Sequence, residues 1–143
     1  MTTIDQVMAR PAQSLRPDSS VLEAIKFLTN HHSGSAPVVT AEGELVGMIS
    51  ELELLDVIFS ASVKDEPISN YMSTEVQSIE SSETLAKVAQ LFALYKFRRL
   101  PVTENGKLVG IIGRRDLMNY ALRTSYVMTD PLVDLFPSLA SVG

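Results

Sequence analysis

The chain has 143 residues, 45% of them hydrophobic and 20% charged, which is typical of a globular protein rather than a disordered one. Its formal net charge of −5 argues against nucleic acid as the main partner and against anionic membranes, because both require a positive field. With no cysteine, no apolar run near the ~20 residues of a membrane span and no signal segment, we expect a cytoplasmic protein without disulfides or a thiolate metal site.

The first predicted helix begins after a methionine-containing turn at 7–11 and a short extended piece at 13–15. Ser20 is a typical N-cap residue, and Glu23 three positions later completes a capping box. Apolar side chains recur at helical spacing, at Val21, Ala24, Ile25 and Leu28. We therefore expect an amphipathic helix that ends near Asn30.

Two strands and a second helix are predicted next. The strands lie within the stretch that begins at Ala36 and ends before Ser50, and they are joined by a turn. A helix is expected from Glu51 to about Phe59. The first part of the chain is therefore predicted to contain a strand, a helix, two strands and a second helix, in that order.

The same pattern then occurs a second time, with Pro101 matching Pro37 and Gly110 matching Gly47. It opens with a methionine turn at 71–74 and an extended piece at 76–79, and Thr84 is the predicted helix cap. A hairpin turns at Asn105-Gly106, two residues that tolerate positive φ. The last predicted helix runs from Arg115 to about Leu122.

These repeats predict an α+β fold in which two β-α-β-β-α units pack through their sheets about a pseudo-twofold axis, because neither has enough apolar surface to fold alone. We place the repeats at 5–60 and 70–123, the linker at 61–69 and a tail at 124–143. The tail begins with Ser125–Pro131, which echoes the opening of each repeat, but it is too short for a third unit.

This order of elements resembles that of a tandem pair of CBS domains, named after cystathionine β-synthase, over residues 5–122. The resemblance is carried by the Pro-Val strand, the glycine turn, the Leu-Val-Gly segment and the polar tetrad that ends each hairpin, Ser50–Glu53 and Gly113–Asp116. It implies a module that is not an enzyme, forms a homodimer and regulates a partner protein that the sequence does not identify. It also implies AMP, ADP, ATP or S-adenosylmethionine as a regulatory ligand, and no required cofactor.

The resemblance further implies two clefts between the repeats, in which a hydroxyl and a carboxylate contact phosphate and ribose. The first predicted cleft takes Met48, Ser50, Glu53, Val76, Gln77, Ser78, Arg98, Arg99, Pro101 and Arg115. The second takes Gln13, Ser14, Ser33, Gly34, Ser35, Ala36, Pro37, Ile111, Gly113 and Asp116. Fixed cations suit phosphate, so the arginines favour the first cleft for a phosphorylated ligand, while the second suits an uncharged adenosyl group.

Both clefts depart from the family pattern. Glu53 stands where aspartate is expected, and Gly113 provides no hydroxyl. A second hypothesis is therefore a structural dimerisation module with clefts that bind nothing. In simpler alternatives, the arginines are solvated or pair with glutamates, and Ser50 and Asp116 only cap helices.

Catalysis has little support in the sequence. No nucleophile with a base, no phosphate-cradling glycine loop and no metal-binding set is recognisable. His31 and His32 lack a further ligand at suitable spacing, which favours a helix-end or surface role. Met8, Met72 and Met128 are expected to fill gaps in the core or at an interface.

Overall fold

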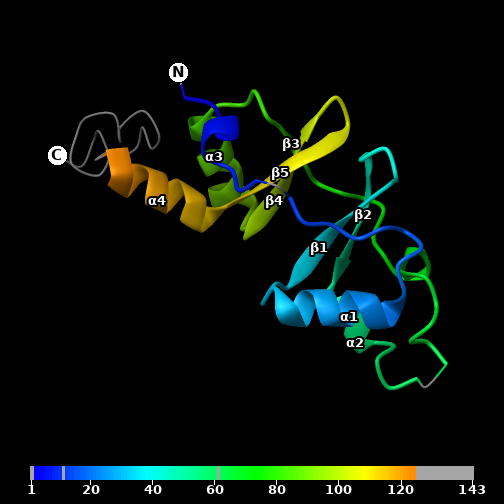
Figure 1. Ribbon diagram of the computed structural model, residues 1–143. Helices are drawn as coiled ribbons and strands as arrows, with labels where there is room; N and C mark the ends of the chain where they lie inside the picture. Colours follow the sequence, from blue (N-terminus) through cyan, green and yellow to red (C-terminus); the bar gives the residue numbers. More distant parts are fainter. Residues whose placement is uncertain (1, 11, 61, 125–143) are drawn as a thin grey trace. The chain divides into compact units, whose positions relative to one another are not determined.

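Helices and strands follow one another in the order that the repeat predicts, except that among the described residues the first repeat has no strand before its first helix (Figure 1). The structure, a computed structural model, describes residues 2–10, 12–60 and 62–124. Its elements are η1 (Ile4–Gln6), α1 (Val21–Asn30), β1 (Ser35–Val39), β2 (Leu45–Ser50), α2 (Glu51–Leu55), η2 (Ile68–Asn70), β3 (Ile79–Glu80), α3 (Leu85–Tyr95), β4 (Arg99–Glu104), β5 (Lys107–Gly113) and α4 (Arg114–Thr124). No helix among these is long and apolar enough to cross a membrane.

The chain divides into two compact units whose limits do not coincide with the repeats. Unit 1 comprises Met1–Ala12, Ser78–Asn105 and Val109–Gly143, and unit 2 comprises Gln13–Gln77 and Gly106–Leu108. The opening of the first repeat therefore lies in the unit that holds the body of the second. Conversely, the opening of the second repeat lies with the body of the first.

Unit 2 is built on the antiparallel pair β1 and β2, in which Ala36 lies opposite Ile49. The core gathers apolar residues of α1, both strands, α2 and the segment that follows α2. Its buried members are Leu15, Val21, Ala24, Leu28, Ala36, Val38, Ile49, Leu54, Val63 and Ile68. The segment predicted as a linker contributes directly, since Val63 and Ile68 belong to this core.

The segment after α2 is also tied to unit 2 by hydrogen bonds. The Ile68 N–H donates to the Ser19 carbonyl at 2.8 Å, and the Val21 N–H donates to the Glu66 carbonyl at 2.9 Å. The Tyr71 hydroxyl donates to Glu66 Oε2 at 2.8 Å. This hydrogen bond, with burial and the negative charge of Glu66, raises the pKa of Tyr71 above 10.0.

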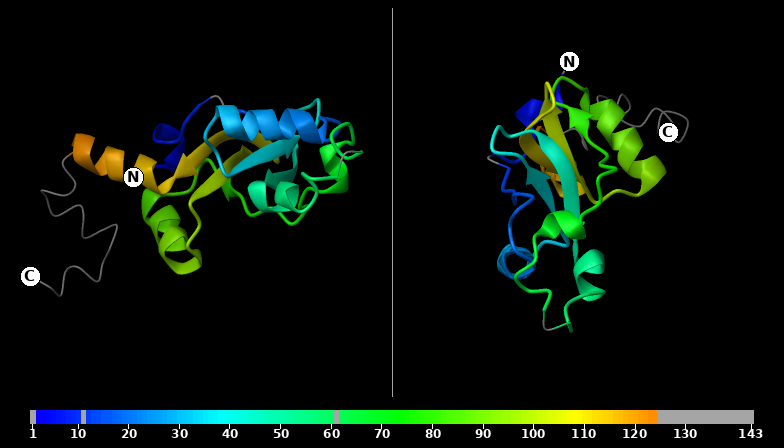
Figure 2. Two further views of the ribbon diagram at one scale, coloured as in Figure 1. Left: turned by 90° about the horizontal axis from the view of Figure 1, so that it is seen from below. Right: turned by 90° about the vertical axis from the view of Figure 1, so that its right-hand side faces the viewer.

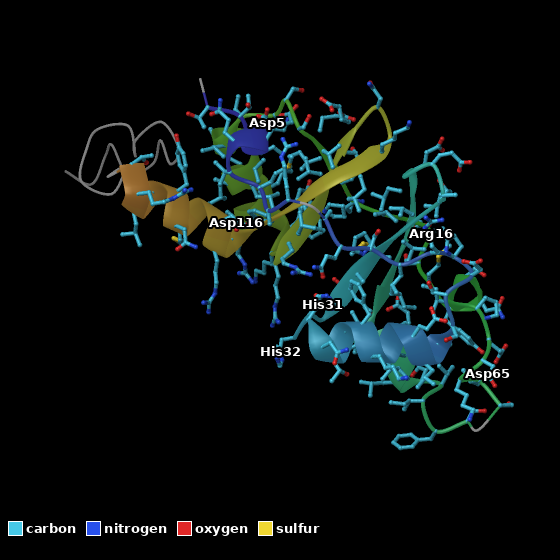
Figure 3. The ribbon with its side chains drawn as sticks, viewed as in Figure 1. Asp5, Arg16, His31, His32, Asp65 and Asp116 are labelled. Atoms are coloured by element: carbon cyan, nitrogen blue, oxygen red, sulfur yellow. The ribbon has the colours of Figure 1, made fainter. Side chains whose placement is uncertain are left out.

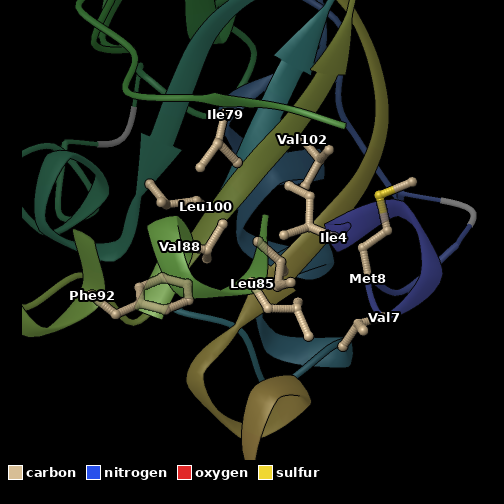
Figure 4. Close-up of a cluster of buried hydrophobic side chains, with 10 residues drawn as sticks. Ile4, Val7, Met8, Ile79, Leu85, Val88, Phe92, Leu100 and Val102 are labelled. Carbon is tan, nitrogen blue, oxygen red and sulfur yellow. The ribbon is translucent and has the colours of Figure 1, made fainter. Parts of the chain in front are cut away.

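Unit 1 contains a three-stranded sheet in the order β3-β4-β5, with β3 parallel to β4. Its core joins η1 to α3 and the sheet (Figure 4). The buried members are Ile4, Val7, Met8, Ile79, Leu85, Val88, Phe92, Leu100, Val102 and Ile112. The N-terminal segment is thus part of this core and not a free arm.

The predicted N-caps Ser20 and Thr84 and the hairpin turn are confirmed, whereas the capping box predicted at Ser20 and Glu23 is only half formed, and a complete one occurs at Ser50 and Glu53 instead. Ser20 Oγ accepts the Glu23 N–H at 3.0 Å, and Thr84 Oγ1 accepts the Lys87 N–H at 3.2 Å. Asn105 and Gly106 have φ angles of 55° and 80°, as a two-residue turn with positive φ at both central positions requires. The local rules of capping and turn chemistry therefore act in both repeats.

Four predicted elements differ from the structure in their extent. The helix expected over 51–59 ends at Leu55, since the apolar side chains beyond it, Ile58 and Phe59, are exposed and no packing extends the helix. The extended piece at 13–15 makes one bridge, from Leu15 to Val38, and the strand expected at 76–79 covers only Ile79–Glu80. The helix expected from Arg115 begins one residue earlier and ends at Thr124.

Candidate ligand-binding site

Each repeat has a junction where the second hairpin strand leads into a helix and the start of the first strand lies alongside. We call residues 98–99 with 113–116 the arginine junction, which lies in unit 1. We call residues 34–35 with 50–53 the glutamate junction, which lies in unit 2. The two junctions occupy matching positions of the repeats, so they can be compared residue by residue.

The backbone of the two junctions is held in the same way. In the glutamate junction the Glu51 N–H donates to the Gly34 carbonyl at 2.9 Å. In the arginine junction the Arg114 N–H donates to the Arg98 carbonyl at 3.2 Å. The loop before each hairpin is therefore fixed against the start of the following helix.

The carboxylate of each tetrad accepts a backbone N–H at the start of its helix. Glu53 Oε2 accepts the Ser50 N–H at 3.0 Å, and Asp116 Oδ2 accepts the Gly113 N–H at 2.7 Å. Asp116 lies at the beginning of α4 in Figure 3. The capping role considered for these tetrads is thus present, and it uses one oxygen of each carboxylate.

The charges of the two junctions are opposite. The arginine junction holds four guanidinium groups, of Arg98, Arg99, Arg114 and Arg115, against the single carboxylate of Asp116. The glutamate junction holds Glu51 and Glu53 and no lysine or arginine. An anion is therefore attracted to the first junction and repelled by the second.

The arginine side chains are exposed and lie around a glycine. A Cβ placed on Gly113 would lie 3.2 Å from Cγ of Arg99, so the Arg99 side chain runs directly over this position. Within the described part of the chain, the side chains of Arg98, Arg114 and Arg115 form no hydrogen bond or ion pair. These three cations therefore keep their hydrogen-bond donors for solvent or a ligand.

In the glutamate junction the glycine, Gly34, lies beside a negatively charged side chain instead of a positively charged one. A Cβ on Gly34 would lie 3.1 Å from Oε1 of Glu51, so a carboxylate covers the position that corresponds to Arg98. The nearby His31 Nδ1 lies 2.7 Å from the Phe27 carbonyl oxygen, and its ring stacks on Phe27 at 4.2 Å. Figure 3 shows His31 and His32 at the end of α1, as expected for a helix-end role.

The predicted site residues divide between the two units. Unit 2 holds Gln13, Ser14, Ser35, Ala36, Pro37, Met48, Ser50, Glu53, Val76 and Gln77, while unit 1 holds Ser78, Arg98, Arg99, Pro101, Ile111, Gly113, Arg115 and Asp116. The hairpin register brings Ser35 opposite Ser50 and Pro37 opposite Met48. Each predicted cleft combines residues of both units, and its assembly stays a prediction.

Sequence reasoning left Arg114 and Glu51 out of the predicted clefts. Their N–H groups hold the loop before the hairpin, and they occupy equivalent positions with opposite charge. Aligning the two repeats position by position would have found this contrast.

Other features of the described residues give no second site of comparable quality. An open hollow of about 450 Å³ borders α4, lined by Val7, Asp116, Asn119, Leu122 and Arg123. No group of three or more histidine, aspartate or glutamate side chains in residues 2–124, positions 11 and 61 aside, could hold a metal ion.

Comparison with known families identifies both repeats. The model of the CBS domain matches residues 4–60 and 68–123. The CBS domain-containing protein YhcV of Bacillus subtilis is 30% identical over 118 residues, which cover 82% of this chain and 84% of that protein. Protein MJ1225 of Methanocaldococcus jannaschii is also 30% identical over 115 residues, but the matched part is only 41% of its length.

A solved structure of similar fold is that of CBSX2 in complex with AMP. It has a TM-score of 0.77 and 27% sequence identity, and the match covers 87% of this chain and 99% of that one. CBSX2 has also been solved as a CBS-pair protein from Arabidopsis thaliana, with a TM-score of 0.76.

Proposed function

Because this chain belongs to the CBS domain family, with both of its repeats matched, we propose that it is a regulatory module that binds an adenosyl nucleotide of the AMP, ADP or ATP class and signals to a partner protein. The AMP complex of CBSX2, a protein of similar fold, supports this class of ligand. The ligand is regulatory, so no chemistry is required of the site.

The observation that carries the proposal is the charge of the arginine junction. The chain is acidic overall, with a net charge of −5, yet four arginines stand at one strand–helix junction. Three of them, Arg98, Arg114 and Arg115, have no side-chain partner among the described residues, whereas Arg99 has one. We place the phosphate groups of the ligand against Arg98, Arg99 and Arg115, since charge-assisted hydrogen bonds to phosphate are among the strongest in proteins.

Calorimetric titration of the full chain with AMP, ADP, ATP and S-adenosylmethionine tests this proposal. We expect Arg98→Ala and Arg115→Ala each to weaken nucleotide binding by about 1.5–3 kcal/mol, roughly tenfold to a hundredfold in Kd. S-adenosylmethionine has no phosphate, so its binding should change much less. Arg16→Ala removes an equally exposed arginine of unit 2 and should leave Kd unchanged.

Two results would contradict the proposal. One is that no ligand at millimolar concentration gives binding heat or thermal stabilisation. A ligand at a hundredfold excess over its Kd should raise the free energy of unfolding by about 2.7 kcal/mol. The other is nucleotide binding that Arg98→Ala and Arg115→Ala leave intact, since the phosphate would then lie elsewhere.

A second candidate function, a structural dimerisation module, is favoured by exposed apolar side chains on the second helix of each repeat. Leu52 and Leu55 of α2 are 76% and 57% exposed, and Met118 and Leu122 of α4 are 66% and 67% exposed. Side chains of this kind commonly mark an interface. Two results together would favour this function. Light scattering would show a dimer without ligand that Leu52→Ser and Met118→Ser disrupt, and the calorimetric titrations would show no nucleotide binding.

A further inference from the structure

Two stripes of exposed side chains follow the second hairpin strand, at matching positions of the two repeats. The one in unit 1, which we call the basic stripe, consists of Arg114, Met118 and Leu122 of α4. The one in unit 2, which we call the acidic stripe, consists of Glu51 and Leu55 of α2 and Phe59 in the turn after it. The members of each recur at every fourth position, so those within a helix lie on neighbouring turns of one face.

The apolar members of both stripes are largely uncovered. Met118 and Leu122 are 66% and 67% exposed, and Leu55 and Phe59 are 57% and 96% exposed. In Figures 1 and 2, α4 extends beyond the end of β5, so the sheet of unit 1 does not cover the whole length of this helix. Apolar side chains that are exposed next to one another commonly mark a contact with another protein.

The charged members of the two stripes have opposite signs. In the described part of the chain, the side chains of Glu51 and Arg114 form no hydrogen bond or ion pair. The neighbouring residues have the same contrast, since residues 51–59 contain three carboxylates and neither lysine nor arginine, whereas α4 contains three arginines and one carboxylate. Each stripe is therefore an apolar surface beside an unpaired charge, and the two charges are complementary.

This difference in charge decides which surfaces of two copies can meet. If each stripe packed on its own equivalent, the Glu51 side chains of the two copies would lie together, and so would the Arg114 side chains. Such like pairs repel one another, and salt screens them less where an apolar contact excludes water. If the two different stripes meet, a carboxylate lies against a guanidinium instead, which favours this pairing over the others.

We propose that the acidic stripe of one copy of this chain docks on the basic stripe of a second copy. Leu55 and Phe59 of the first copy pack on Met118 and Leu122 of the second, and Glu51 pairs with Arg114 at the rim of the contact. Arg114 is not among the arginines placed against the phosphate groups of a nucleotide. The contact therefore concerns self-association alone and does not depend on the proposed function.

Sedimentation equilibrium of the full chain without nucleotide tests this pairing through two single charge reversals. Glu51→Arg and Arg114→Glu each place like charges at the contact, so each should raise the Kd of association at least about tenfold. In a mixture of the two variants, every contact between different stripes of the two chains again joins an arginine to a glutamate. The Kd of the mixture should therefore return to within about threefold of the parent value. A variant that failed to fold could not be rescued in this way.

Three further measurements accompany the reversals. Arg16→Glu makes the same change of charge at an exposed arginine of unit 2 outside both stripes, and it should leave Kd within about twofold of the parent value. Phe59→Ser should weaken association and leave the stability of the monomer unchanged, because this side chain is 96% exposed in the single chain. Added salt should weaken association of the parent, because it screens an attractive pair.

Four results would overturn the proposal. A chain that stays monomeric at its highest soluble concentration lacks the contact. Single reversals that leave Kd unchanged, or a mixture no tighter than either variant alone, would mean that Glu51 and Arg114 do not meet. Association that strengthens with added salt would mean that like charges lie together. Nucleotide binding, measured separately by the calorimetric titrations, affects none of these outcomes.

Discussion

At the residue scale, Asp116 accepts a hydrogen bond at the start of α4, and it is also one of the residues predicted to contact a ligand. Its Oδ2 accepts the N–H of Gly113, which is a buried residue, whereas Glu53 accepts the N–H of the half-buried Ser50. A buried N–H that loses its acceptor cannot turn to water, so its loss costs more. The stability of the arginine junction therefore depends on the same carboxylate that was predicted to contact a ligand.

We expect Asp116→Ala to lower the free energy of unfolding by about 1–2 kcal/mol, and Glu53→Ala by less. Asp116→Asn keeps an oxygen acceptor, so its loss of unfolding free energy should be less than half that of the alanine variant. Urea denaturation measures the free energy of unfolding of all three variants. The control is Asn119→Ala, on the exposed side of α4, whose free energy of unfolding should stay within about 0.5 kcal/mol of that of the parent. Equal losses for Asp116→Ala and Asn119→Ala would mean that the Gly113 hydrogen bond adds no stability.

Sequence could predict the types of residue in the junctions but not their arrangement. The capping roles of Ser20 and Thr84 follow from local chemistry alone, because the cap and its partner are three residues apart. The contact of Arg114 with Arg98 joins residues of different elements, and no local rule indicates it. The likeness of the two repeats was the only signal that could have revealed it.

At the scale of elements, Gly47 of β2 and Gly110 of β5 each allow a methionine from another segment, Met72 and Met8 respectively, to lie against the strand. A Cβ on Gly110 would also lie 3.0 Å from the backbone oxygen of Ala9, and one on Gly47 lies at the same distance from the oxygen of Ser73. The backbone atoms cannot move aside as readily as the methionine side chain. A side chain at either glycine therefore pushes the segment that contains the methionine off the sheet.

We expect Gly110→Ala to lower the free energy of unfolding by about 1–3 kcal/mol, which is typical of overpacking. Met8→Ala in the same chain should recover part of this loss, giving a coupling energy of about 0.5–3 kcal/mol in a double-mutant cycle. Gly34→Ala is the control, because its Cβ would meet only the mobile end of the exposed Glu51 side chain. Strictly additive losses would show that Met8 does not pack on Gly110.

The periodicity of the helices and the hairpin turn were predictable, since the apolar stripes and Asn105-Gly106 act within a few residues. The residue at which α2 ends was not predictable. Leu55, Ile58 and Phe59 continue the apolar pattern, yet their side chains are 57%, 41% and 96% exposed. Packing decides where a helix of this length ends, and the sequence pattern alone does not show which apolar residues find a partner.

At the scale of the whole molecule, the first residues of each matched CBS domain lie in the core that holds the body of the other. Ile4 begins η1 and the first match, residues 4–60, and it lies in the core of unit 1. Ile68 begins η2 and the second match, residues 68–123, and it lies in the core of unit 2. The repeats could be recognised from the sequence, but the exchange could not, because the same apolar residues would suit either core.

The exchange predicts where two matched substitutions act. Ile4 and Ile68 are both fully buried, so Ile4→Ala and Ile68→Ala should each cost about 2–5 kcal/mol. Hydrogen exchange measured residue by residue should then differ between them, since local opening reports the core that has lost its contact. Ile4→Ala should speed exchange mainly at Val102 and Ile112 of unit 1, and Ile68→Ala mainly at Val38 and Ile49 of unit 2. The opposite pattern, with each substitution acting on the body of its own repeat, would mean that the first residues of the two domains are not exchanged.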